Sequence, residues 1–577
     1  MLKLFKNLKP YWLPIIGIII FIFFQVLSEL FLPTIMADIV DVGIVKGDTA
    51  YILQRGGWML LATFLGTLCA VMAGFLSSRT GLAFGRDLRV QVFKKATEFS
   101  LYEFDELGTA SMITRTTNDI TQIQNLVVMV LRMFVMAPLM LIGGIFMAVS
   151  KDPKLSLVLV GVLPFLAALI AFVARRSIPM FKTMQIRIDR LNLVLRENLT
   201  GLRVIRAFNR TDFEQKRFTK ANTDLMTVSI DVNKLMAMLM PLMMLIFNFT
   251  TIAIIWFGSI RIDSGSMEVG SLMAFIQYAM QILFSLIMAT MMFIMVPRAS
   301  ASATRINEVL DIEATIVDPK QPKISQGGNG HLKFENVSFS YPGAEEPAIS
   351  GITIEALPGE ITAIIGGTGS GKTTLINLIP RFYDVQSGRI LLDGLDIKDM
   401  TQESLRSRIG LVPQQAVLFS GTVADNIRFG STNLSDEDVK HAADISQATS
   451  FINEMPDGFN AVIAQGGINV SGGQKQRLAI ARALASKPDI YIFDDSFSSL
   501  DFKTDARLRR ALKSETETAT VLIVAQRVTT VIDADCIIVL ENGKIVSMGN
   551  HQELLRLCPI YQEIVASQLS EEDLNEH

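Results

Sequence analysis

The sequence contains a glycine-rich segment, between a short apolar run and a helical pattern, whose residue types could bind phosphate. The apolar run covers residues 361–365, and the segment comprises Gly366, Gly367, Thr368, Gly369, Ser370, Gly371, Lys372, Thr373 and Thr374. It matches the P-loop pattern Gly-x4-Gly-Lys-Thr in the strand–loop–helix context that this pattern requires. Glycines let backbone amides turn toward phosphate oxygens, and the helix start adds its dipole. We therefore expect Lys372 to contact the β- and γ-phosphates of a nucleotide and Thr373 to bind Mg²⁺.

Two further motifs in the same region could contact a nucleotide. An apolar run at 490–493 ends in Asp494, and after a P-loop such a carboxylate is expected to hold Mg²⁺ or its water. A Ser-Gly-Gly-Gln segment, residues 471–474, opens another helical pattern and is a second anion-binding helix start. Because one nucleotide needs only one P-loop, this second segment suggests that two such domains sandwich ATP between them.

The residues before these motifs are predicted to cross a membrane. Half of the 577 residues are apolar and 19% are charged, but the apolar residues are concentrated in the first 300 positions. A membrane span needs roughly 20 apolar residues. Six segments qualify, approximately at 13–36, 57–77, 133–150, 155–174, 235–260 and 271–296. Two of their connections are long and show helical periodicity, so we expect helices that continue beyond the bilayer on the cytoplasmic face.

These patterns predict a multidomain membrane protein. Residues 1–320 form a six-helix, all-α transmembrane domain with long cytoplasmic helical extensions, and residues 321–330 form a glycine-rich linker. Residues 331–577 form an α/β P-loop NTPase domain with a helical subdomain, and this domain opens with an alternating strand pattern. The net charge of −3 gives no basic field for a nucleic-acid partner. The three cysteines have no metal or disulfide spacing.

Polar residues inside two predicted spans indicate either a cavity or helix–helix hydrogen bonds. Gln25 and Glu29 share one helical face of the first span, and Gln277 and Gln281 share one face of the sixth. A methionine-rich composition of the fifth and sixth spans suits varied apolar ligands, although it also suits lipid contact. Arg132, at the start of the third span, either attracts an anion or extends to the membrane surface.

The order of the nucleotide motifs resembles that of ATP-binding cassette (ABC) ATPases across residues 331–570. The P-loop is followed by Gln414, by Val470, Ser471, Gly472, Gly473 and Gln474, and then by Asp494, Asp501 and Gln526. The resemblance implies that Tyr341 stacks on adenine, that Gln414 contacts Mg²⁺, and that Asp501 lies in a crossing D-loop. It implies that residues 470–474 cap the γ-phosphate held by the opposite subunit.

The membrane half resembles the type IV exporter domain. Residues 104–119 and 197–208 resemble the coupling segments of its two inner loops.

Two residues depart from the family pattern at the position of the chemistry. Asp495 follows Asp494 where the family usually places a catalytic glutamate, and Gln526 stands at the switch position that is usually histidine. Asp is one methylene shorter than Glu, and a misplacement of about 1 Å can cost ~10²-fold in rate. Glutamine can donate a hydrogen bond to the γ-phosphate, but it cannot relay a proton. We expect a pocket that holds ATP and Mg²⁺ but hydrolyses ATP slowly, unless Asp495 acts through a rearranged water.

This combination predicts one half of a heterodimeric exporter, similar to bacterial multidrug exporters with one degenerate ATP site. The expected partners are a second, homologous ABC half-transporter, membrane lipids and an amphiphilic or lipophilic substrate. We expect a multi-pass protein of the bacterial cytoplasmic membrane with its nucleotide-binding domain in the cytoplasm. The alternatives are a homodimeric lipid or peptide flippase in which Asp495 is catalytic, an ATP-gated channel or regulator, and an importer of metal–chelate complexes.

Overall fold

The computed structural model describes residues 1–323, 328–431 and 433–568, without the side chains of residues 2, 290–295, 297 and 298. The chain forms two compact units. One contains Met1–Thr97 and Gly108–Ile312, and the other contains Glu98–Leu107 and the chain from Glu313 onward. The first unit thus ends before residue 320, and residues 98–107, which the sequence placed in the membrane domain, belong to the second. Part of the predicted linker, residues 324–327, lies outside the described residues.

The first unit is built from long apolar helices. Among the described residues, six helical stretches are long and apolar enough to cross a membrane, which confirms the six predicted spans. Most extend well beyond the predicted apolar cores, and the third is a series of helical pieces from Thr109 to Lys151. The elements are α1 (Leu2–Phe5), α2 (Trp12–Asp38), α3 (Thr49–Thr97), α5 (Thr109–Thr114), α6 (Ile120–Met129), α7 (Val135–Lys151), α8 (Ser156–Thr200), α9 (Leu202–Ala207), α10 (Thr211–Asp263) and α11 (Val269–Asp311).

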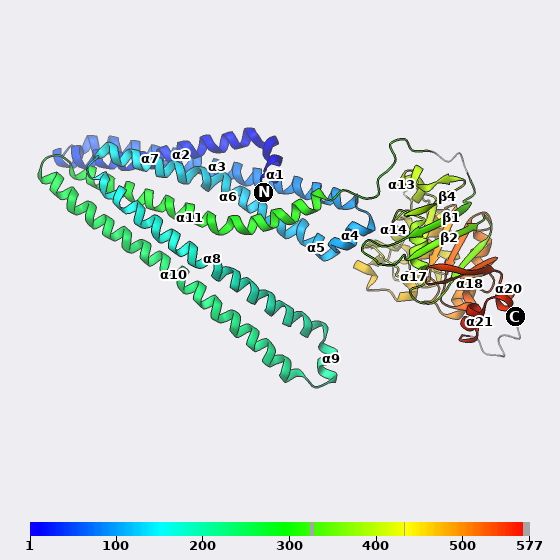
Figure 1. Ribbon diagram of the computed structural model, residues 1–577. Helices are drawn as coiled ribbons and strands as arrows, with labels where there is room; N and C mark the ends of the chain where they lie inside the picture. Colours follow the sequence, from blue (N-terminus) through cyan, green and yellow to red (C-terminus); the bar gives the residue numbers. More distant parts are fainter. Residues whose placement is uncertain (324–327, 432, 569–577) are drawn as a thin grey trace. The chain divides into compact units, whose positions relative to one another are not determined.

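Two of these helices form a hairpin that leaves the other helices. Helices α8 and α10 run side by side along much of their length, and the short helix α9 joins them at the tip (Figure 1). No residue of α9 is buried. At the other end of the hairpin, the Arg261 Nε donates to the buried Asp152 carboxylate over 2.6 Å, which ties α10 to the α7–α8 turn.

The second unit contains a mainly parallel sheet that positions the nucleotide motifs. Its strand order is β12-β11-β3-β10-β9-β6, and every pairing except β11–β12 is parallel. Because parallel strands end at the same edge of a sheet, the P-loop after β3 and Asp494 at the end of β9 lie at one edge. They flank the end of β10, which lies between these two strands. The strands are β3 (Ile361–Ile365), β6 (Ile409–Val412), β9 (Ile490–Asp494), β10 (Thr520–Val524), β11 (Cys536–Glu541) and β12 (Lys544–Gly549).

An antiparallel sheet and a helical subdomain complete this unit (Figure 1). The antiparallel sheet has the order β2-β1-β4-β5, with β1 (Leu332–Phe339), β2 (Ile349–Ala356), β4 (Ser387–Leu392) and β5 (Leu395–Asp396). A short pair joins β7 (Gly421–Thr422) to β8 (Val462–Ile463). The helices are α4 (Leu101–Leu107), α12 (Lys372–Leu378), α13 (Gln402–Arg406), α14 (Val423–Arg428), α15 (Asp436–Ile445), α16 (Thr449–Glu454), α17 (Gly472–Ala485), α18 (Phe502–Glu515), α19 (Val528–Val531), α20 (His551–Leu557) and α21 (Pro559–Ala566).

Candidate functional site

The P-loop connects β3 to α12 and depends on glycine at positions where backbone approaches backbone. A Cβ on Gly366 would lie 2.1 Å from the Leu540 carbonyl oxygen. Gly371 has a left-handed φ of +97°, and a Cβ there would lie 2.7 Å from the Ala348 oxygen. Only glycine fits both positions without displacing these neighbouring chains. The loop can therefore approach a polyphosphate with its own amides, as the sequence predicts.

Lys372 lies inside this loop. Its Nζ donates to the carbonyl oxygens of Gly366 at 2.8 Å and Gly367 at 2.7 Å. Burial lowers the pKa of this ammonium, while the nearby carboxylates of Asp495 and Asp494 act in the opposite direction. A phosphate placed in the loop would supply the negative charge that the buried ammonium needs.

Thr373 and Asp494 converge from α12 and β9. The Thr373 hydroxyl lies 3.4 and 3.5 Å from the two Asp494 carboxylate oxygens. Burial raises the pKa of Asp494, and the neighbouring charge of Asp495 adds to this effect. A hydroxyl and a carboxylate are the hard oxygen ligands that Mg²⁺ prefers, and a divalent cation would stabilise the buried carboxylate. These residues fit the metal that the sequence predicts.

Asp495 has a left-handed backbone conformation that is closely defined by hydrogen bonds. Its φ is +46°, in the left-handed region. Its N–H donates to the Val524 carbonyl at 2.9 Å, and its carbonyl accepts from the Ser498 hydroxyl at 2.8 Å. Its side-chain oxygen lies 3.4 Å from the Gln414 Nε2. Since both backbone groups are bonded, the reach of this carboxylate is set by its side-chain length.

The other predicted nucleotide residues lie around this pocket in different states of exposure. Gln414 and Gln526 are exposed, and the Gln526 backbone carbonyl accepts from the Gln568 side chain at 2.8 Å. The Tyr341 hydroxyl lies 3.1 Å from that of Thr374, which places the ring beside the P-loop helix. Tyr383, which sequence reasoning missed, meets Tyr341 edge-on at 5.4 Å between ring centroids. An exposed aromatic ring supported by a second ring can stack on a base.

The second anion-binding segment has an ordered helix start. Ser471 caps α17 by accepting from the Gln474 N–H at 3.3 Å, and the Gln474 side chain accepts from the Ser471 N–H at 2.8 Å. Ser471 and Gly472 are exposed, and Gly473 is half-buried. Val470, by contrast, is buried in the hydrophobic core, so its side chain supports the segment and does not face solvent. Asp501 caps α18 by accepting from the Thr504 N–H at 2.9 Å.

The first inner loop is held by two sets of polar contacts. In the second unit, the buried Glu103 of α4 accepts from the Thr315 N–H at 3.1 Å and from its hydroxyl at 2.6 Å. In the first unit, the buried Asp119 accepts from the Arg305 Nε at 2.7 Å and from the Ser302 hydroxyl at 2.8 Å. Within each unit these contacts bond a part of the loop to a later segment of the chain, Thr315 in the second unit and the C-terminal part of α11 in the first.

A cavity of about 370 Å³ lies among α2, α7, α8, α10 and α11. Of the four polar residues predicted from the spans, Glu29 and Gln281 line it, together with Met140, Met240, Met243, Met244 and Met280. Gln25 is buried and donates to Glu29 Oε1 at 2.9 Å, and Gln281 donates to the Glu29 carbonyl at 3.2 Å. Gln277 is exposed and does not line the cavity. The Gln25–Glu29 bond lies within α2, whereas Gln281 both lines the cavity and bonds α11 to α2, so a substrate role for these residues stays a prediction.

Family models match both halves of the chain. Residues 15–286 match the family described as ABC transporter transmembrane region, and residues 349–498 match the family described as ABC transporter. An uncharacterized ABC transporter ATP-binding protein of Mycobacterium tuberculosis is 44% identical over 98% of this chain and 97% of its own length.

Two named relatives and one solved structure are also similar over most of their lengths. A fatty acid ABC transporter ATP-binding/permease protein of Mycobacterium bovis is 34% identical over 83% of this chain and 75% of its own. An ATP-dependent lipid A-core flippase of Desulfotalea psychrophila is 33% identical, covering 92% of each. The ATP-bound structure of a bacterial Atm1-family ABC exporter matches with a TM-score of 0.81 and 25% identity, over 97% of this chain and 98% of that one.

In this family the ATPase domain couples ATP hydrolysis to transport. With its six membrane-crossing helices, exporter fold and P-loop site, the chain belongs to the ABC transporters as a multi-pass half-transporter, with one membrane domain joined to one ATPase domain.

Proposed function

We propose that this chain is one half of a heterodimeric exporter of amphiphilic compounds in the bacterial cytoplasmic membrane, and that its own ATP site is slow. The observation that carries the proposal is the fixed position of Asp495. Its backbone is bonded on both sides and its side chain is one methylene shorter than that of glutamate, so its carboxylate reaches less far into the pocket. All the residues expected to bind phosphate and Mg²⁺ are present. The site is therefore expected to bind ATP, although it hydrolyses ATP slowly.

The chemistry at this pocket then follows from its own residues. Lys372 would exchange the loop carbonyls for phosphate oxygens. Thr373 and Asp494 would hold Mg²⁺, which would neutralise phosphate charge. Asp495 is too short to orient an attacking water closely, and Gln526 donates a hydrogen bond but carries no charge. ATP is therefore retained long enough to keep two ATPase domains together.

A second, dissimilar chain would make this arrangement productive. Ser471–Gln474 are intact at the start of α17 and can complete a partner's ATP site. The cytoplasmic tip at α9 exposes Leu202, Val204 and Phe208, with 44%, 61% and 74% of their surfaces accessible. These apolar residues lie far from the predicted spans, where lipid does not cover them, and so suit a protein partner. We infer that α9 docks on the partner's ATPase domain.

The substrate cavity supports an amphiphilic ligand. It combines Glu29 and Gln281 with flexible methionines, which adapt to varied apolar shapes. The relatives named as a fatty acid transporter and a lipid A-core flippase handle lipids, and they favour a second candidate function. In that candidate, a homodimer of this chain moves lipid, and Asp495 is catalytic at both sites.

Purification of the tagged full chain from its native membrane distinguishes the two functions. The subunits that accompany it are identified by intact-mass measurement, and ATP turnover is measured on the same sample. The heterodimer predicts a second, homologous subunit and turnover that survives Asp495→Asn. Self-paired copies whose rapid turnover is abolished by Asp495→Asn would establish the homodimer and contradict the proposal.

A further inference from the structure

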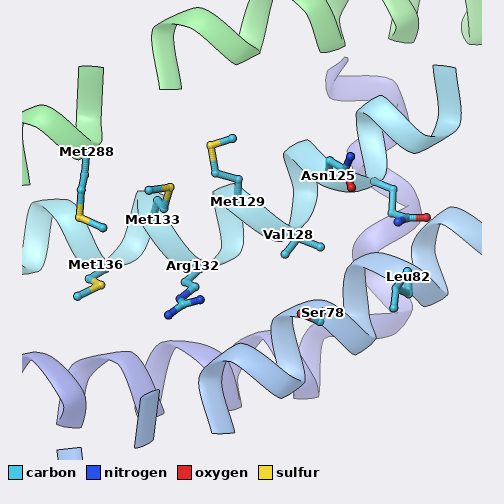
Figure 2. Close-up of a pocket in the computed structure, with 10 residues that line it drawn as sticks. Ser78, Leu82, Asn125, Val128, Met129, Arg132, Met133, Met136 and Met288 are labelled. Atoms are coloured by element: carbon cyan, nitrogen blue, oxygen red, sulfur yellow. The ribbon is translucent and has the colours of Figure 1, made fainter. Parts of the chain in front are cut away.

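The first unit contains a second cavity, of about 650 Å³, formed by α3, by the stretch from α6 to α7, and by α11. Figure 2 shows Arg132 pointing from the α6–α7 stretch toward α3, where Ser78 lies. Arg132 occupies a π-helical turn, Val130–Phe134, which interrupts the regular helix between α6 and α7. Such turns are frequent at functional sites, because they redirect side chains.

Two polar residues that line this cavity, Ser78 and Arg132, lie at one level of the chain. Ser78 directly follows the predicted span 57–77, and Arg132 directly precedes the predicted span 133–150. Both therefore lie where their helices leave the bilayer on the cytoplasmic side, and Asn125 lies two helical turns farther out. Among the described residues, Arg132 has no carboxylate within 4 Å, whereas the nearby Arg89 donates to Gln124 and Thr121. The guanidinium of Arg132 is thus available to an external anion.

The apolar side of the cavity continues into the predicted membrane region. Met133 and Met136 follow Arg132 into the third span, and Met288 faces them from α11 (Figure 2). Unbranched thioethers adapt to a flexible hydrocarbon chain with little cost. A simple extension of Arg132 to the membrane surface would need neither a cavity nor this row of methionines. The two ends of the cavity together complement an amphiphile, whose charged head would lie at the membrane interface and whose hydrocarbon chain would lie below it.

The shape of the cavity is set by close helix packing beside it. A Cβ on Gly81 would lie 2.3 Å from Val128 Cγ2, and a Cβ on Gly85 would lie 2.5 Å from the Gln124 Oε1. The glycines, four residues apart on α3, thus let α6 approach this helix closely. The volume lies within the range of about 300–1,000 Å³ that holds one small ligand.

We propose that this cavity binds an anionic amphiphile with a single apolar chain. Its carboxylate or phosphate head is bound by Arg132, with Ser78 as a hydrogen-bond donor, and its chain lies along Met133, Met136 and Met288. This rests on the proposed function only in that the exported compounds are amphiphilic. Binding at this cavity needs no ATP turnover and no partner chain, so it can be tested separately.

The experiment measures binding of radiolabelled oleate to the full chain in a nonionic detergent. Arg132→Gln is expected to weaken oleate binding by about ten- to a hundred-fold, as loss of a hydrogen bond to a charged group does. Arg132→Lys retains the charge and should recover most of the affinity. The matched control is Arg79→Gln, because Arg79 is exposed beside Ser78 but does not line the cavity. That variant should bind oleate as the unchanged chain does.

Uncharged oleyl alcohol tests the headgroup, and it should bind weakly and with no dependence on Arg132. Competition between oleate and oleoyl lysophosphatidate compares the affinity of the cavity for a carboxylate head with its affinity for a phosphate head. Equal oleate affinity in Arg132→Gln and the unchanged chain would overturn the proposal, as would tight binding of the alcohol. If Arg132→Gln instead prevents pairing with a second chain while oleate binding persists, the cavity belongs to a subunit interface and the proposal is wrong. A homodimer found by co-purification would contradict the proposed function but would leave this result unaffected.

Discussion

Restoring a glutamate at position 495 should accelerate hydrolysis at this chain's own ATP site. The Asp495 backbone is bonded to Val524 and Ser498, so the added methylene becomes added reach of about 1.5 Å. A displacement of about 1 Å can cost ~10²-fold, and Asp495→Glu should therefore raise turnover by up to ~10²-fold. Adding Gln526→His restores a group that can carry charge and relay a proton, so the double variant should exceed the single one.

The assay is phosphate release by the full chain, purified alone and reconstituted in lipid, at saturating Mg·ATP. A glutamate at φ +46° is less favourable than aspartate, whose short polar side chain tolerates this region, so thermal stability is measured in parallel. Asp495→Asn is the matched control, because it keeps the side-chain length and removes the charge. Unchanged turnover in a folded, ATP-binding double variant would refute the geometric explanation of the slow site.

Three further outcomes follow from contacts in the structure. Lys372→Ala should weaken binding of a fluorescent ATP analogue by about ten- to a hundred-fold, because it removes the buried cation; an affinity within twofold would contradict this. Asp494→Asn should raise the Tm of the nucleotide-free protein at pH 7–8 by about 2–4 °C, if it gains about 1 kcal/mol, and should abolish stabilisation by Mg·ATP. Because burial raises the pKa of Asp494 above its ordinary value, ionisation of this carboxyl costs stability as the pH rises through the folded pKa. The gain in Tm from Asp494→Asn should therefore disappear below pH 4. A gain in Tm that does not depend on pH would contradict this cause. Arg305→Ala should destabilise the first unit by about 1–3 kcal/mol, since Asp119 stays buried without the guanidinium that pairs with it and keeps only the Ser302 hydroxyl bond. Adding Asp119→Asn should recover part of the loss in a thermal unfolding assay, and no recovery would contradict this.

The nucleotide site was largely predictable because its signals are local. The P-loop needs glycines within a few residues of one another, and Asp494 needs only an apolar strand before it. The six spans were predictable for the same reason, since hydrophobicity is read within about 20 residues.

What escaped prediction depends on contacts between distant residues. Residues 98–107 join the ATPase unit because Glu103 bonds Thr315, 212 positions away. Tyr383 supports Tyr341 through a ring contact that no spacing indicates. The Arg132 cavity is formed by residues of α3, α6, α7 and α11, and sequence reasoning had singled out only Arg132 near it.

The central claim is that this chain binds Mg·ATP in its own pocket without hydrolysing it efficiently. The most direct measurement incubates the full chain, purified alone, with radiolabelled ATP and Mg²⁺, and then identifies the nucleotide that remains bound. The account predicts about one intact ATP per chain, with turnover that changes little in Asp495→Asn. Predominantly ADP in the pocket, with rapid phosphate release that Asp495→Asn abolishes, would contradict it.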